Sequence, residues 1–173
     1  MRKISFAILA AVVALSGCST YRGSNAISVT NGSTFAVMPF VNQSNTPLAA
    51  ENVETIVCSE LSAKNITYVA YESADEPKDL KSILDDSYTI RKANEWLKTV
   101  SHNYVISGSV DEWNYKAGLD GEPVVSVTVR VKDVNGNVVF EKTGSRSGFG
   151  RESLNGAGQK VVENILSDIN YSR

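Results

Sequence analysis

The chain has 173 residues, of which 42% are hydrophobic and 21% charged, so it is long and apolar enough for one packed domain with a short appendage. Its formal net charge is −2, and the balance becomes more acidic without the leader, which carries Arg2 and Lys3 and no acid. Because nucleic-acid affinity comes from neutralising phosphates with basic residues, this composition argues against a nucleic-acid partner.

Residues 1–17 are predicted to be the signal peptide of a lipoprotein. Two basic residues are followed by an apolar run over residues 4–15 that is too short to span a membrane, and then by Leu15-Ser16-Gly17-Cys18. This run resembles the bacterial lipobox, in which a cysteine receives a diacylglycerol and the chain is cut before it. The alternative is an uncleaved signal anchor with an incidental cysteine. We expect lipidation at Cys18 and durable attachment through its acyl chains.

Residues 18–33 are rich in Ser, Asn, Gly and Thr and are predicted to form a flexible tether. Fully extended, about 15 residues reach at most about 50 Å, so the domain would stay close to the membrane that holds Cys18. Ser19 follows the cysteine. In the sorting rule of bacterial lipoproteins, Asp at that position retains a protein at the inner membrane, so Ser19 favours the outer membrane with the domain facing the periplasm.

Residues 34–173 are predicted to form a single α/β domain. A buried strand over 35–41 precedes a helix over about 47–61, whose apolar residues recur at three- and four-residue spacing. A second strand follows at 66–70, so the domain is expected to begin with a βαβ unit of parallel strands. A further amphipathic helix is predicted over residues 90–100.

The segment 104–150 is predicted to be an antiparallel meander of three strands, followed by a last helix that begins near Glu152 or Ser153. Valines at alternate positions over 125–131 face one way and polar residues the other, which is typical of a half-buried strand. Asn135-Gly136 supplies the positive φ angles of a two-residue hairpin turn. The predicted order is β-α-β-α-β-β-β-α, a mixed β-sheet with helices packed on it.

The sequence lacks the usual catalytic and metal-binding patterns. The chain has one histidine, His102, with no second metal-type residue at ligand spacing, and no serine lies in a recognisable nucleophile turn. Asp111 and Glu112 are adjacent in a predicted strand and are expected on opposite faces, which argues against a carboxylate pair. We therefore predict no enzyme activity, no metal and no cofactor.

Three stretches resemble known envelope families. The opening strand and helix, FAVMPFVNQSNTPLAAENVETIVCSEL, resemble the start of a broad family that includes CsgG, the curli secretion pore, and the lipoprotein activators of penicillin-binding proteins. Two later stretches, RKANEWLKTVSHNYVISGSVDEWNYKAGLDGEPVVSVTVRVKDVNGNVVF and TGSRSGFGRESLNGAGQKVV, resemble the PelC family of outer-membrane lipoproteins in Pel exopolysaccharide export. The resemblance covers nearly the whole chain after the leader.

The resemblance to PelC implies a role in biofilm matrix export. Members of that family are understood to assemble as a ring, a dodecamer, under the outer membrane. There an acidic funnel guides a cationic amino-sugar polysaccharide toward an export porin of the PelB type. Aromatic residues on one rim contact outer-membrane lipid, and Phe149 holds the place of the family's tryptophan.

Candidate site residues follow from the resemblance and from the charge pattern. They are Cys18 for lipidation, Phe149 for membrane contact, Asp111, Glu112, Asp120 and Glu122 for a polymer-guiding acidic surface, and Arg146 and Arg151 for subunit contact. Three alternatives stay open. Phe149 folds back onto the core, Asp120 only bonds its own backbone in a turn, or the two arginines are free in solvent. A second acidic cluster lies within residues 75–86.

Two other functions are possible for such a chain. A CsgG-like secretion pore subunit needs long amphipathic hairpins to cross the bilayer, and the connection over residues 115–123 is too short to supply them. A penicillin-binding protein activator needs a long tether to reach an inner-membrane synthase, and residues 18–33 are too few. The sequence therefore favours the export role.

Overall fold

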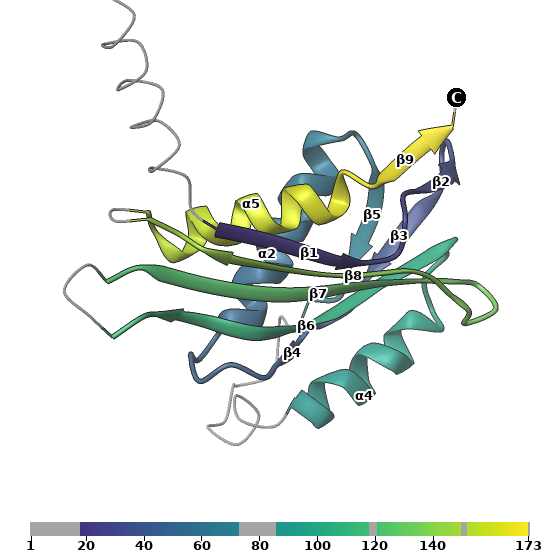
Figure 1. The fold of residues 1–173 in the computed structure, drawn as a ribbon. Coiled ribbons are helices and arrows are strands. Elements are labelled where there is room, and N and C mark those ends of the chain that lie inside the picture. The colour runs from purple at the N-terminus through teal and green to yellow at the C-terminus, as the bar shows by residue number, and fades with distance from the viewer. Residues whose placement is uncertain (1–17, 73–85, 118–120, 150–151, 173) are drawn as a thin grey trace, which may run out of the picture.

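A seven-stranded mixed sheet of order β1-β8-β7-β6-β3-β5, with β4 paired to β6, forms the centre of the molecule (Figure 1). The structure is a computed structural model that describes residues 18–72, 86–117, 121–149 and 152–172. The strands are β1 (Cys18–Gly23), β2 (Ile27–Thr30), β3 (Thr34–Val37), β4 (Val41–Asn42), β5 (Thr67–Ala70), β6 (Tyr104–Tyr115), β7 (Pro123–Asp133), β8 (Val138–Ser147) and β9 (Ile169–Ser172). The helices are α2 (Ala49–Ala63), α4 (Asp86–Leu97) and α5 (Leu154–Leu166).

The predicted fold class and the order of the main elements are confirmed. The strand β3 runs parallel to both β5 and β6, as expected of a βαβ start. The strands β6, β7 and β8 form the antiparallel meander. Figure 1 shows α2 and α5 on one face of this sheet and α4 on the other side.

The prediction of a flexible tether over residues 18–33 is wrong. Within this segment, β1 pairs antiparallel with β8 at the edge of the main sheet, and β2 pairs in parallel with β9 in a separate ribbon. The small polar residues indicated a tether because they lack a strong strand propensity. At the edge of β8, however, the unpaired backbone groups of the meander accept a further strand whatever its side chains.

The core lies between the sheet and the helices α2 and α5. The four valines at positions 125, 127, 129 and 131 are fully buried, which confirms the predicted alternation of β7. Trp113 is 2% exposed and packs beneath α5. A Cβ atom on Gly158 would lie only 2.3 Å from Cη2 of Trp113, so glycine is required where the helix crosses the indole.

The helix α5 begins at Leu154, close to the predicted start, and Ser153 is its N-cap residue. The Oγ of Ser153 accepts a hydrogen bond from the Gly156 N–H at 3.0 Å, which caps the first turn. Behind this cap, Val161 and Ile165 lie on the buried side of the helix. The cap at Ser153, four residues after Phe149, sets the position at which α5 begins.

The β7–β8 connection is wider than the predicted two-residue turn. The Gly136 N–H donates to the Asp133 carbonyl at 3.0 Å, and within this turn only Gly136 has a positive φ, of 83°. The Asp133 carboxylate accepts the backbone N–H groups of Asn135 and Asn137. Hydrogen bonds to Asn137 lower the pKa of Asp133, so this carboxylate stabilises the wider turn in its charged form.

Candidate functional site

The end of the sheet that carries Cys18 brings together the predicted lipidation and membrane-contact residues. In the β1–β8 ladder, Cys18 lies directly opposite Ser147, which precedes Phe149 by two residues. Cys18 is exposed. Opposed residues in an antiparallel pair have Cα atoms only about 4.5–5.5 Å apart, so the anchor position and the Phe149 loop are neighbours.

Phe149 is exposed to 51%, and backbone hydrogen bonds hold Gly148 before it and Glu152 after it. The Gly148 N–H donates to the Pro123 carbonyl at 2.8 Å, and the Glu152 N–H donates to the Phe149 carbonyl at 3.2 Å. A Cβ on Gly148 would lie 2.5 Å from both Pro123 and Glu152, so only glycine fits there. The alternative in which Phe149 folds back onto the core is therefore wrong.

Arg146 connects β1 to the start of α5 within one chain. Its guanidinium donates to the Ser19 Oγ at 3.0 Å and pairs with the Glu152 carboxylate at 3.0 Å. Lys160 donates to the other Glu152 oxygen at 2.7 Å. The Arg146 side chain therefore has its partners inside its own subunit. This arrangement differs from the predicted contact with a neighbouring subunit. Arg151, its predicted counterpart, lies outside the described residues.

The charge state of Glu152 follows from these contacts. Burial alone would raise the pKa of this carboxyl, but the hydrogen bonds and charges of Arg146 and Lys160 outweigh burial and hold the pKa below its usual value. Only 11% of the Glu152 side chain and 15% of the Arg146 side chain are exposed, so water screens this pair little. We call Ser19, Arg146, Glu152 and Lys160 the anchor cluster.

The predicted acidic residues are divided between two places. Glu122 lies near the β6–β7 connection, where its carboxylate is 3.6 Å from the ammonium of Lys116. Asp111 and Glu112 lie on β6, and Asp120 falls outside the described residues. The acidic cluster predicted within residues 75–86 cannot be placed either, because the structure describes neither residues 73–85 nor the side chain of Asp86.

Asp111 and Glu112 share one face of the sheet, which corrects the prediction that they point to opposite faces. The register between β6 and β7 shifts between Val110 and Glu112. This bulge lets both Val110 and Trp113 face the core. Glu112 is opposite Ser126, and residues that oppose each other across two strands project from the same face.

This polar face also carries rows of hydroxyl groups that sequence reasoning missed. The Asp111 carboxylate accepts hydrogen bonds from Ser109 at 2.9 Å and Thr128 at 3.2 Å. Thr128 is in turn 2.8 Å from Thr143, and Ser126 has the same kind of contact with Ser145 at 2.9 Å. Asp111 is thus held by its neighbours, whereas Glu112 is exposed to solvent. The alternation of β7 predicted polar positions but not which hydroxyls meet.

The described part of the chain contains neither a candidate metal site nor a candidate membrane-spanning helix. Over residues 18–72, 86–117, 121–149 and 152–172, no group of three or more His, Cys, Asp or Glu residues could hold a metal ion. None of the helices in those ranges is long and apolar enough to cross a membrane. The Nδ1 atom of His102 lies 3.0 Å from the Val100 carbonyl, a contact within its own loop.

Comparison with known proteins identifies relatives among solved structures. No family model and no curated protein matches the chain. The PelC dodecamer from Paraburkholderia phytofirmans has a TM-score of 0.74 at 32% identity, covering 90% of this chain and 100% of that one. A variant of the same protein in another crystal form has a TM-score of 0.74 at 33% identity with the same coverage.

A more distant relative shares the fold alone. Lipoprotein GNA1162 from Neisseria meningitidis has a TM-score of 0.52 at 19% identity, covering 79% of this chain and 99% of that one. None of these relatives is described as an enzyme, so the comparisons do not indicate one here. The identity and the full coverage of the first two structures are sufficient to assign the family. This chain belongs to the PelC family.

Proposed function

We propose that this chain is an outer-membrane lipoprotein that faces the periplasm and assembles with copies of itself into a ring. The ring guides a cationic exopolysaccharide to an export porin of the PelB type, as part of biofilm matrix export. Membership of the PelC family carries the proposal, because its relatives in P. phytofirmans form dodecamers. No observation favours a secretion pore subunit or a penicillin-binding protein activator.

The placement of Cys18 beside the Phe149 loop supports membrane attachment at this end of the sheet. Acyl chains on Cys18 would enter the bilayer next to the exposed ring of Phe149. Moving this apolar ring from water into the membrane interface is favourable. Because β1 belongs to the sheet, no free tether separates the anchor from Phe149. Phe lacks the polar N–H that suits Trp to the interface, so the acyl chains would provide most of the affinity.

Replacing Cys18 with serine should abolish lipid attachment, because the thiol is the acyl acceptor at the cleavage site. We expect the variant to incorporate no radiolabelled fatty acid and to leave the membrane fraction. Cys58→Ser is the matched control, since Cys58 is the other cysteine of the chain and lies in α2. Labelling of Cys18→Ser equal to that of the native protein would exclude the lipoprotein assignment.

Repetition around a ring would turn a modest acidic surface into a strong field. Each acid on a surface that faces the lumen is repeated once per subunit, and a negative field concentrates a cationic polymer near the pore. Glu112 is the suitable candidate among the predicted acids that the structure describes, because Asp111 is hydrogen-bonded to Ser109 and Thr128, and Glu122 lies near Lys116. The competing interpretation is a solvated surface with no ligand.

Reversing the charge of Glu112 tests polymer guidance directly. We expect Glu112→Lys to fold, assemble and localise as the native protein does, but to reduce secreted polysaccharide several-fold. Glu163→Lys makes the same change of charge at an exposed position of α5, on the opposite side of the sheet, and should secrete normally. Equal secretion by both variants would show that Glu112 does not guide the polymer.

A further inference from the structure

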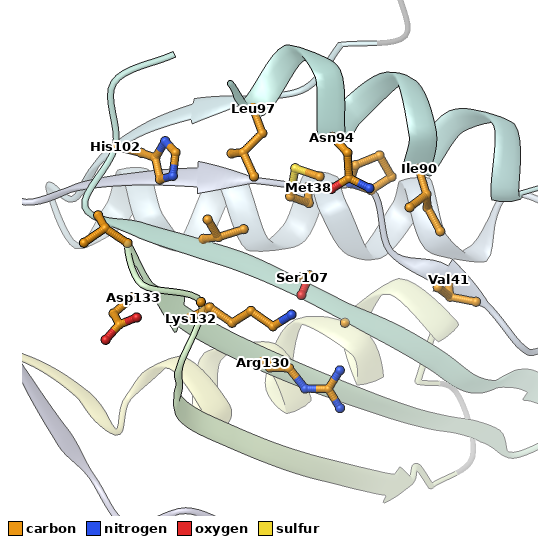
Figure 2. A pocket seen from close by; sticks show the side chains of 15 residues that line it. Met38, Val41, Ile90, Asn94, Leu97, His102, Ser107, Arg130, Lys132 and Asp133 are labelled. Carbon is orange, nitrogen blue, oxygen red and sulfur yellow. The ribbon is translucent and has the colours of Figure 1, made fainter. Parts of the chain in front are cut away.

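A groove of about 430 Å³ lies between α4 and the polar face of β6 and β7 (Figure 2). Figure 2 shows Ile90, Asn94 and Leu97 projecting from α4 toward the sheet. Apolar side chains line the groove from α4 and from the β3–β4 segment, and charged side chains line it from β7: Met38, Val41, Ile90, Leu97, Arg130, Lys132 and Asp133. The groove is therefore apolar along one wall and charged along the other, where Lys132 and Asp133 are adjacent and opposite in charge.

The two cations of the groove differ in their partners. The Arg130 guanidinium is 2.6 Å from the Glu141 carboxylate, which neutralises it. Lys132 has no ion-pair partner within the described residues. The groove thus fits an apolar side chain that has a carboxylate close beside it.

A second copy of the chain is the occupant that the proposed ring requires. Copies in a ring contact each other head to tail, so each copy needs two different and complementary surfaces. Over residues 18–72, 86–117, 121–149 and 152–172, the large apolar side chains that are exposed are Leu48, Tyr115, Val134, Val138 and Phe149. Tyr115 and Phe149 lie toward the Cys18 end, whereas Val134 lines the groove itself and Val138 belongs to the same hairpin. Among these exposed apolar residues of the described chain, Leu48 is the one that remains.

Leu48 has an unusual backbone conformation at the start of α2. Its φ is 61°, in the left-handed region that is costly for leucine, and 47% of its surface is exposed. Side chains kept exposed by a strained backbone are candidates for contact with a partner. Glu51, in the first turn of α2, places a carboxylate near it in the sequence.

We propose that Leu48 of one copy inserts into the groove of the next copy, with Glu51 facing Lys132. The apolar wall receives the leucine, and the ammonium of Lys132 gains a partner that it lacks among the described residues of its own chain. This contact is the head-to-tail interface of the ring, and it rests on the self-assembly proposed above. It also gives α4 a function, because the side of this helix that faces the groove becomes buried between copies.

Cysteine cross-linking tests the contact in the full-length protein purified in detergent, in a Cys58→Ser background. The variant with both Leu48→Cys and Ile90→Cys should form a ladder of disulfide-linked species larger than dimers under mild oxidation. Each single-cysteine variant should give at most dimers, because one thiol per chain can form only one disulfide. Oligomers of native size that yield no ladder would overturn the assignment.

A polar substitution separates assembly from folding. Asn accepts the left-handed conformation better than Leu, so Leu48→Asn should unfold at the same or a higher denaturant concentration. We expect it to need at least about tenfold more protein to assemble, measured by light scattering. Lys132→Glu should weaken assembly in the same way, whereas Lys98→Glu, exposed beyond the last turn of α4, should not.

The outcomes distinguish the interface from the proposed ring. If the native protein is monomeric at every concentration, both free and on lipid vesicles, then self-assembly and this interface both fail. If the native protein assembles and Leu48→Asn assembles equally well, the ring stands and the groove is not its interface. A ladder from the double variant, together with weakened assembly of Leu48→Asn, supports the contact.

Discussion

Replacing Trp113 with alanine is expected to lower the free energy of unfolding by about 3–5 kcal/mol, the range observed when a large buried aromatic side chain is removed. The indole is 2% exposed and lies under α5 at Gly158. Its removal leaves a cavity between sheet and helix that neither element can close, because each is held by its own hydrogen bonds. The loss should be visible as a lower midpoint of urea unfolding with little change in slope.

Trp96→Ala is the matched control for this loss. Trp96 lies on α4, is partly exposed, and makes an edge-on contact with Tyr71 at a centroid distance of 5.6 Å. Its removal should cost about 1 kcal/mol, mainly that aromatic contact. If Trp113→Ala costs no more than Trp96→Ala, the packing of α5 onto the sheet does not depend on Trp113.

A second substitution shows whether Trp113 and Gly158 form one packing unit. In the native protein, Gly158→Ala would force its new methyl group against the indole, and overpacking of this kind typically costs about 1–3 kcal/mol. In the Trp113→Ala background the same methyl group enters an empty space. The two losses should therefore sum to more than the loss in the double variant.

The strands and helices that bury one face could be predicted because burial leaves a period in the sequence. The valines of β7 alternate with polar residues, and the apolar residues of α2 and α5 recur at helical spacing, so each element shows its buried side without knowledge of its neighbours. The antiparallel meander follows because its strands are close in sequence. These local signals were sufficient for the fold class.

The bulge in β6 could have been found from a break in this period. Val110 and Trp113 are both buried but three residues apart, whereas one face of a regular strand repeats every two residues. One extra residue between them restores both to the core and moves Glu112 to the face of Asp111. Strict alternation therefore placed the two acids on opposite faces.

The position of Cys18 could not be predicted, because it depends on pairing between distant parts of the chain. The register joins Cys18 to Ser147, and no local pattern in residues 18–23 indicates which strand they meet. Tyr21 of β1 is partly buried, and burial raises the pKa of its hydroxyl, but this burial follows from the pairing and leaves no pattern in the sequence. The contact between Arg146 and Ser19 has the same origin, so sequence reasoning assigned Arg146 to a neighbouring subunit.

Replacing Arg146 with alanine is expected to cost about 1.5–3 kcal/mol of stability, the range for hydrogen bonds to charged groups. The change leaves the Glu152 carboxylate partly buried with Lys160 as its remaining cation, and it frees Ser19. We expect β1 to separate from β8 more often than in the native protein. Amide hydrogen exchange over residues 18–23 should accelerate, while exchange in β7 should change only with global stability.

Arg130→Ala is the matched control, because it also removes an arginine from a pair with a glutamate. The Arg130–Glu141 pair is 43% exposed on both sides, so its loss should cost less than about 1 kcal/mol and should not change exchange in β1. If Arg146→Ala costs no more than this control and leaves β1 protected, the anchor cluster does not hold the N-terminal strand.

The stability lost in Arg146→Ala should also depend on pH, in a direction set by the pKa of Glu152. The folded-state pKa of this carboxyl is below its ordinary value of 4.5, so the cluster contributes its full stability above that value and loses it as pH falls through the folded pKa. The difference between the native protein and Arg146→Ala should therefore be constant from pH 6 to 8, and shrink below about pH 4.5. In a Glu152→Gln background the difference should be small and nearly independent of pH. A difference that grows on acidification would mean that Arg146 acts through a group other than Glu152.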